Sequence, residues 1–370
     1  MIFPDILGQS RSKSFLHQLA TSERVPHALI FLGKTGSGNL ALALAFAQML
    51  QCERPGPDGG CGQCNACRKA GQFTHPDIHF SFPTVGAKEV STNFLKEWRA
   101  ALAENPYLDV NSWLQRLGAD NKQGNITADE CSAILKKLSL KAFEGRYKIL
   151  VMWLPEYLGK EGNRLLKLIE EPPEQTIFLL AAENPDLILS TILSRCQIVK
   201  TDALTDAEVA DGLAEKRTID PERARQISFL ADGDFNLALQ LADNPDSDDA
   251  NLLLDWLRKC WRGDGLEMVK WTDEFAKMGR ENQKQFLQYG LHFLREMMAF
   301  NLTADPNLRL RPAELQTAQN MSKVLDFQKI TQVARIFNDN IFYIERNANP
   351  KILFLDTSIR LHKIMKGMSS

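Results

Sequence analysis

The stretch that decides the fold is FLGKTGSGNL, residues 31–40. An apolar segment runs into a glycine-rich turn, and the alanine- and leucine-rich run that follows predicts a helix from about Asn39 to Gln51. Glycines recur at the spacing of a phosphate-binding loop, in which backbone amides at a helix N-terminus hold phosphate groups. These glycines are Gly33, Gly36 and Gly38. The local pattern predicts a strand, a phosphate-type loop and a helix.

The end of this loop lacks the residues that ATP chemistry needs. A complete loop ends in Gly-Lys-Ser or Gly-Lys-Thr, where the lysine contacts the β- and γ-phosphates and the hydroxyl binds Mg²⁺. Here Gly38 is followed by Asn39 and Leu40, and Lys34 stands at the opposite end of the loop. The loop amides remain available for a weakly bound phosphate, and the glycines also suit close packing of strand and helix. We expect no productive ATP binding.

A second segment leads to the same expectation. The apolar run KILVMWL, residues 148–154, is followed by Pro155 and Glu156. An ATPase of this type needs an aspartate after such a strand to bind Mg²⁺ and a glutamate to activate water. Because proline stands in the aspartate position, Glu156 has no metal to act beside. Both losses predict a chain that does not hydrolyse ATP.

Composition sets the broad class. The chain has 370 residues, 44% of them hydrophobic and 24% charged, with a formal net charge of -2. That charge provides no general attraction to DNA, so nucleic-acid contact would need a local patch or partner proteins. The sequence has no long apolar run and begins with a polar segment, which predicts a cytoplasmic protein without membrane contact. In a reducing compartment the seven cysteines favour metal ligands or buried thiols over disulfides.

Strand and helix signals alternate through the first 200 residues. This alternation predicts a parallel sheet covered by helices on both faces. Thr127 and Glu130 form a capping-box pattern for a helix to about Phe143. Residues 83–125, which include ENPYLDV, read as a polar, irregular insertion at the surface. The expected strands are residues 27–33, 77–83, 147–154 and 176–183.

The second half of the chain is predicted to be helical. TDAEVADGLAEK opens with a capping signal, and apolar residues then recur at helical spacing to the end. DNPDSDD, residues 243–249, is the best linker candidate. The predicted domains are a sheet domain at 1–200, a helical lid at 201–245 and a helical domain at 246–370.

Four cysteines lie close together in CERPGPDGGCGQCNAC, at the spacing C-x8-C-x2-C-x2-C. Four thiolates with no open position predict a structural, tetrahedral zinc site, and redox use of the C-x-x-C pairs is the lesser alternative. His75 and His79 are superfluous once four sulfurs are counted. The predicted ligands are Cys52, Cys61, Cys64 and Cys67. The isolated cysteines, predicted to be core thiols, are Cys131, Cys196 and Cys260.

The order of these motifs resembles that of the bacterial clamp-loader subunits of the AAA+ class, the gamma/tau and delta prime proteins of DNA polymerase III. The resemblance covers residues 1–200 and is most specific in its last part, which ends in Ser-Arg-Cys. It implies a RecA-like parallel sheet, an all-α lid and an all-α C-terminal collar. The motifs are ILGQ, PHALIFLGKTGSGN, the four-cysteine knuckle, THPD and NRLLKLIEEPPEQTIFLLAAENPDLILSTILSRCQ.

Within that family, the departures point to the delta prime branch. Asn39, Pro155 with Glu156, and Asn236 stand where active members keep nucleotide-handling residues, whereas Arg195 of the Ser-Arg-Cys triplet is retained. The resemblance implies a non-hydrolysing stator subunit of the DNA polymerase III complex whose Arg195 acts as an arginine finger on a neighbouring ATPase. Its implied partners are the gamma/tau and delta subunits and, through the complex, the sliding clamp and primer-template DNA.

Two other functions compete with this hypothesis. One is an active ATPase of the gamma/tau type, which the altered loop disfavours. The other is a zinc-dependent nucleic-acid-binding module. The knuckle sequence GGCGQCNAC is neutral, and only Arg68 and Lys69 follow it, which is poor for phosphate contacts. An arginine such as Arg195, taken alone, is more often solvated or ion-paired than functional.

Overall fold

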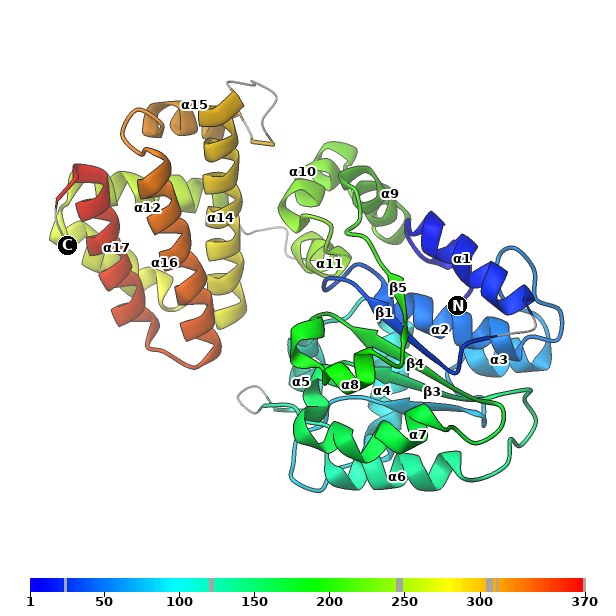
Figure 1. Ribbon diagram of the computed structural model, residues 1–370. Helices are drawn as coiled ribbons and strands as arrows, with labels where there is room; N and C mark the ends of the chain where they lie inside the picture. Colours follow the sequence, from blue (N-terminus) through cyan, green and yellow to red (C-terminus); the bar gives the residue numbers. More distant parts are fainter. Residues whose placement is uncertain (23–24, 120–122, 244–248, 304–308, 311, 369–370) are drawn as a thin grey trace. The chain divides into compact units, whose positions relative to one another are not determined.

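The computed structural model describes residues 1–22, 25–119, 123–243, 249–303, 309–310 and 312–368. The chain divides into two compact units, Met1–Asp243 and Asn244–Ser370. The first contains a sheet covered by helices, and the second is built from helices (Figure 1). Residues 244–248 of the predicted linker lie outside the described residues.

In the described part of the first unit, five parallel strands form one sheet in the order β2-β3-β4-β1-β5. The strands are β1 (Ala28–Leu32), β2 (Ile78–Ser81), β3 (Lys148–Trp153), β4 (Thr176–Ala182) and β5 (Gln197–Lys200). The four predicted strands are confirmed. Sequence patterning missed β5, because it is an edge strand in which only Val199 is buried. Such a strand lacks the apolar run that reveals its buried neighbours.

The sheet is covered on both faces, so β3 and β4 are buried along their whole length, and all their residues except the first, Lys148 and Thr176, are apolar. Leu29 and Phe31 of β1 pack on one side with α2, and Ala28 and Ile30 pack on the other with α6, α7 and α8 (Figure 1). Every residue of α2 is buried, so its sequence carries no polar stripe. The helices of this unit are α1 (Ser10–Thr21), α2 (Asn39–Gln51), α3 (Asn65–Gly71), α4 (Leu95–Glu104), α5 (Val110–Arg116), α6 (Ala128–Leu138), α7 (Leu166–Glu170), α8 (Ser190–Leu193), α9 (Asp206–Lys216), α10 (Pro221–Ala231) and α11 (Phe235–Asp243). Short 3-10 segments occupy Phe3–Asp5, Ser91–Phe94, Pro155–Leu165 and Pro185–Leu187.

The insertion, residues 83–125, is neither irregular nor peripheral. It contains α4 and α5, and its ends meet in an antiparallel bridge between Thr84 and Asn125. Trp98 and Trp113 are 1% and 0% exposed, and their rings lie 5.1 Å apart in an edge-to-face arrangement. The expectation of a polar surface excursion was wrong because two tryptophans within a polar segment suffice to anchor it in the core.

The helix after Thr127 begins as predicted and ends early. The Thr127 hydroxyl accepts a hydrogen bond from the Glu130 amide, but the Glu130 carboxylate accepts one from the Ser91 amide instead of completing the capping box. The helix then stops at Leu138 rather than near Phe143. A tertiary contact has therefore replaced one of the two hydrogen bonds that the capping-box pattern predicts.

The helices α9, α10 and α11, which we term the lid, pack around a small apolar core. Val209, Leu213, Ile227 and Phe235 belong to this core. Thr205 and the α9 residue Glu208 form a complete capping box, as the sequence predicts. The lid lies in the same compact unit as the sheet.

The described residues of the second unit form helices joined by short turns, and the unit has an aromatic centre. The ring of Trp256 stacks on that of Trp271 at 5.0 Å, and its Nε1 donates to Ser358 at 2.8 Å. Within the described residues, no helix combines the length and apolarity that a membrane span needs. The helices are α12 (Asp249–Arg262), α13 (Gly265–Phe275), α14 (Arg280–Thr303), α15 (Pro312–Met321), α16 (Phe327–Glu345) and α17 (Pro350–Lys366).

Candidate functional site

The glycine loop connects β1 to α2 at the carboxyl end of the sheet. Gly36 and Gly38 have φ values of 69° and 95°, which side chains rarely adopt, and Gly38 is the N-cap of α2. The Gly33 amide donates to the Ala182 carbonyl at 3.2 Å and joins the loop to the end of β4. The backbone thus has the form of a phosphate-binding loop.

The two side chains at the end of the loop have partners within the chain. Nδ2 of Asn39 donates to the Ala182 carbonyl at 2.9 Å, and its Oδ1 accepts from the Leu40 amide at 2.7 Å. Leu40 is 2% exposed and belongs to the main hydrophobic core. In a complete loop these two positions hold the phosphate-binding lysine and the Mg²⁺-binding hydroxyl. Here Asn39 instead contacts the end of β4, and Leu40 packs in the core.

Acidic side chains gather near the loop. Oε1 of Glu156 accepts hydrogen bonds from the Glu183 and Asn184 amides at 2.5 and 2.8 Å, so this carboxylate caps the turn after β4. Thr35 of the loop donates to Glu183 at 2.8 Å. Burial, reinforced by the nearby Glu156, raises the pKa of Glu183 to about 7. Burial also raises the pKa of Asp234, at the start of the lid helix α11, to about 7.

In their ionised form these carboxylates would repel the phosphates of a nucleotide, since like charges at short range disfavour each other. Motif reading assigned Glu156 but missed Glu183 and Asp234. A signal was present in each case, because Glu183 directly follows the longest buried strand and Asp234 directly precedes a helix.

Arg195 lies in the turn between α8 and the edge strand β5. Its Nη1 donates to the Thr191 carbonyl at 2.9 Å, and its Nη2 lies 3.1 Å from Oε2 of Glu170. The side chain is 31% exposed. The guanidinium is thus held in one orientation at an edge of the sheet while part of it faces solvent.

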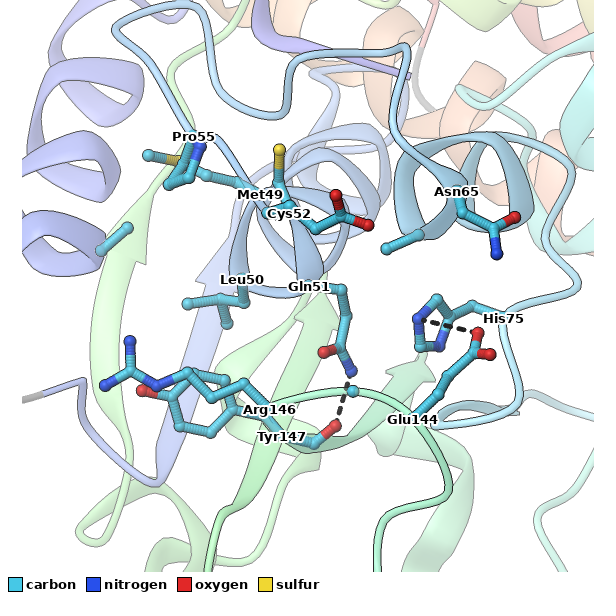
Figure 2. Close-up of a pocket in the computed structure, with 14 residues that line it drawn as sticks. Met49, Leu50, Gln51, Cys52, Pro55, Asn65, His75, Glu144, Arg146 and Tyr147 are labelled. Carbon is cyan, nitrogen blue, oxygen red and sulfur yellow. Dashed lines mark hydrogen bonds and ion pairs between the residues drawn. The ribbon is translucent and has the colours of Figure 1, made fainter.

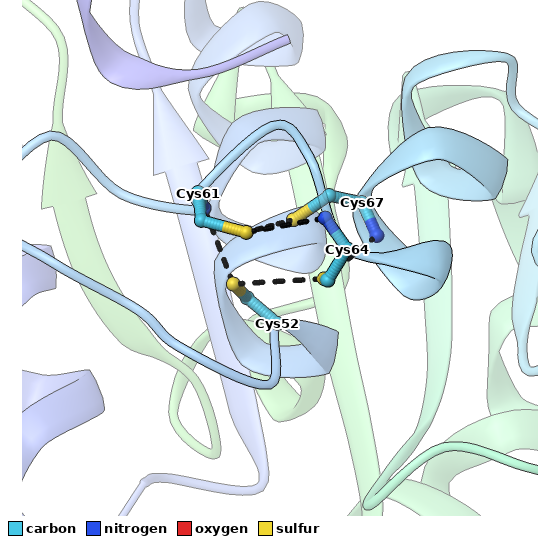
Figure 3. A group of neighbouring side chains, drawn as sticks. All are labelled: Cys52, Cys61, Cys64 and Cys67. Carbon is cyan, nitrogen blue, oxygen red and sulfur yellow. Dashed lines mark hydrogen bonds between the residues drawn. The ribbon is translucent and has the colours of Figure 1, made fainter.

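The four cysteines form one cluster at the C-terminal end of α2 (Figure 3). Cys52 is the C-cap of α2 and Cys64 is the N-cap of α3. All four Sγ atoms lie within 4.8 Å of one another, and two of the pairs are 4.0 Å apart. A tetrahedral zinc ion with Zn–S bonds of about 2.3 Å separates its sulfurs by about 3.8 Å. The arrangement fits a closed zinc site.

Backbone amides surround these sulfurs as they do in thiolate knuckles. The Cys61 and Arg54 amides donate to Sγ of Cys52 at 3.2 and 3.3 Å, and the Cys64 amide donates to Sγ of Cys61 at 3.3 Å. The last bond and one from Gln63 lower the pKa of Cys61 to about 6. Burial raises the pKa of Cys67, so a cation is needed to keep all four sulfurs ionised.

A pocket of about 490 Å³ borders the cluster and involves Cys52 (Figure 2). Nε2 of Gln51 donates to the Tyr147 carbonyl at 2.5 Å, and Nε2 of His75 lies 3.7 Å from the Glu144 carboxylate. His75 therefore faces Glu144 rather than completing a metal site. The polar groups of this pocket hold the segment before β3 against the end of α2.

This architecture, a parallel sheet with helices on both faces and a glycine loop after an inner strand, is the predicted α/β fold, followed by the predicted all-helical segments. Residues 8–205 match the model of the family described as "DNA polymerase III, delta subunit". Because the match spans more than half of the chain, the chain belongs to this family of clamp-loader subunits.

Individual relatives are similar at low identity. The DNA polymerase III subunit tau of Bacillus subtilis is 23% identical over 95% of this chain and 60% of its own length. The subunit delta' of the same organism is 26% identical over 60% of this chain and 56% of its own length. The chain thus spans less than two thirds of these two relatives. The delta' subunit of Yersinia pestis is 25% identical over 68% of this chain and 73% of its own length.

A solved structure of a DNA polymerase III gamma subunit-related protein from Thermotoga maritima covers 96% of this chain and 99% of its own. Its TM-score is 0.45 at 11% identity.

Proposed function

We propose that this chain is the non-hydrolysing, delta prime-type subunit of a DNA polymerase III clamp loader, and that Arg195 completes the ATP site of a neighbouring gamma/tau subunit. The observation that carries the first half is the loop end, where Asn39 bonds to the Ala182 carbonyl and Leu40 lies in the core. A loop whose last two positions carry neither a cation nor a metal-binding hydroxyl cannot stabilise the charge that develops during phosphoryl transfer.

Arg195 supports the second half. A guanidinium offers a planar fork of N–H donors that matches phosphate oxygens and does not lose its proton. Glu170 and the Thr191 carbonyl orient this fork at a sheet edge, where a neighbouring subunit has access. Arginine fingers contribute about 10³ to 10⁵ in rate to well-studied phosphoryl-transfer enzymes.

The remaining parts take supporting roles in this proposal. Cys52, Cys61, Cys64 and Cys67 hold one structural zinc ion, which supplies cross-linking and no open position for substrate. Residues 1–200 form the sheet domain, 201–245 the lid and 246–370 a collar that joins gamma/tau and delta. The chain works in the cytoplasm and meets the sliding clamp and primer-template DNA through the assembled complex.

The test is reconstitution with the gamma/tau and delta subunits, followed by clamp loading on primed DNA. We expect Arg195→Ala to leave assembly intact and to lower the loading rate strongly. Arg195→Lys is expected to be nearly as damaging, because an ammonium is a point charge without the fork. Arg116→Ala is the matched control, because this arginine also pairs with a glutamate, Glu104, in the same unit.

Clamp loading is the stricter readout, since other ATP sites in the complex sustain part of the total hydrolysis. Loading at the wild-type rate by the Arg195→Ala complex refutes the finger. Magnesium-dependent ATP turnover by the isolated wild-type chain refutes the non-hydrolysing assignment and favours the gamma/tau alternative.

A further inference from the structure

The insertion, residues 83–125, has an anchored base and a projecting tip. The Thr84–Asn125 bridge closes its base, and Trp98 and Trp113 fix its helices in the sheet core. The tip, residues 105–109, connects α4 to α5. Its central residue, Tyr107, is 3% exposed, yet it is buried with the lid residues rather than with the tryptophans. The tip therefore joins two parts of the unit that are separate in the sequence.

Tyr107 fills the space between the lid and the start of the chain. Its ring meets that of Phe235 at 5.1 Å and 69°, and its hydroxyl accepts a hydrogen bond from the Leu7 amide at 2.9 Å. Nζ of Lys216 lies 5.6 Å from the centroids of both rings. One aromatic side chain thus contacts α9, α11 and the N-terminal segment together.

Polar groups beside Tyr107 reinforce the contact. Nδ2 of Asn105 donates to Oδ1 of Asn236 at 2.7 Å, and Nδ2 of Asn236 donates to Asp109. Nε2 of Gln240 also donates to Asp109, at 3.2 Å. Asn236 is 4% exposed, so these bonds are shielded from competing water.

The same tip closes over the glycine loop. A Cβ atom added to Gly38 would lie 3.1 Å from Cε1 of Tyr107, and one added to Gly36 would lie 1.8 Å from Oδ1 of Asp234. The Phe235 amide donates to the Gly36 carbonyl at 3.2 Å. Glycines in phosphate loops allow close approach of the backbone to a ligand. Here atoms of the insertion and of the lid, rather than a ligand, lie close to the backbone of these glycines.

We propose that the insertion tip is an internal occupant of the glycine loop: Tyr107 takes the place of a bound nucleotide and holds the lid in one position without any ligand. The inference rests on the proposed function only in taking the loop as inactive. It assigns to the insertion the positioning of the lid, with Tyr107 as the positioning residue and Asn105 and Asp109 as its polar support.

The experiment is hydrogen exchange of the isolated full-length chain, with and without 5 mM Mg-ATP. Tyr107→Ala is expected to speed amide exchange in α9 and α11 roughly tenfold or more, because local opening of the lid no longer breaks the aromatic contact. Tyr107→Phe retains the ring and should stay within about threefold of wild type. Asn236→Ala removes two bonds to the tip from the lid side and should give an intermediate increase.

Two controls keep the readout specific. Arg116→Ala alters the exposed face of the insertion and should leave lid exchange unchanged. Exchange in β3 and β4 reports whether the Tyr107→Ala chain is globally folded; if it is not, Asn236→Ala still decides the question. Mg-ATP should not alter lid exchange in the wild-type chain.

Unchanged exchange of α11 in Tyr107→Ala or Asn236→Ala overturns the proposal, and so does protection of the wild-type lid by Mg-ATP. Neither outcome bears on Arg195, because no neighbouring subunit is present. Conversely, normal clamp loading by the Arg195→Ala complex leaves this inference standing.

Discussion

The two ends of α2 differ in how the side chains there are satisfied. At its N-terminus, the glycine loop has its side chains satisfied within the chain: Asn39 bonds to the end of β4, and Leu40 is in the core. At its C-terminus, Cys52 joins three other cysteines whose sulfurs face only one another and backbone amides. One end retains the backbone form of a ligand site, but its last two side chains are bonded or packed within the chain. The other brings together four groups that a cation would complete.

The largest expected effect comes from breaking the cysteine end. Cys64→Ser should reduce bound zinc from about one ion per chain to none and lower the free energy of unfolding of the first unit by several kcal/mol, because a structural metal contributes directly to folding. Elemental analysis and thermal unfolding measure the two effects. Cys196→Ser, outside the cluster, should retain the metal. Absence of zinc in the wild-type protein refolded with zinc contradicts the site.

A smaller effect is expected from rebuilding the glycine end. Asn39→Lys with Leu40→Thr restores the residues of a complete loop, but it places a charge and a hydroxyl where the chain is 5% and 2% exposed. We expect the double variant to lose about 2–4 kcal/mol of stability in denaturant unfolding. It should show no ATP turnover, since Pro155 still replaces the metal-binding aspartate.

Lys34→Ala is the control for this variant, because Lys34 belongs to the same loop and is exposed. Its expected change is below about 0.5 kcal/mol. A double variant as stable as wild type would show that the internal contacts of the loop contribute less to stability than its geometry indicates.

The smallest effect concerns the acidic groups around the loop. Glu183 has a pKa of about 7 when folded, above its ordinary value of 4.5. The folded state therefore holds this proton more tightly than the unfolded state, and stability falls as pH rises from about 4.5 through 7. Glu183→Gln removes that loss and can still accept the bond from Thr35. We expect a gain of roughly 1–3 kcal/mol at pH 8.

Urea unfolding at pH 5 and pH 8 measures this effect, and the advantage of the Gln variant should widen with pH. Glu170→Gln serves as the comparison, because Glu170 is an exposed partner of Arg195 and exposed ion pairs contribute little to stability. An advantage for Glu183→Gln that is independent of pH would mean that its carboxyl is not the group that titrates.

The sequence by itself determined most of the strands and the residue types at the end of the glycine loop. Apolar runs identified β1, β3 and β4, because strands buried on both faces need apolar residues at most positions. The identities of Asn39 and Leu40 were enough to predict a loop without ATP chemistry. The close spacing of the cysteines was enough to predict their cluster, since few residues separate them and the glycines between them let the chain turn.

Tertiary structure alone decided the contacts of the insertion and the surroundings of the loop. The Leu7 amide and the Tyr107 hydroxyl are 100 residues apart in sequence, and Asp109 and Asn236 are 127 apart. No local periodicity encodes such pairs, because their partners are chosen only when the sheet and the lid have folded together. The same reason explains why Glu130 left its capping box for the Ser91 amide. The strand β5 was missed for another reason, because an edge strand with one buried residue has no apolar run. Residue type set what each group is able to do, and long-range packing set which partner it met.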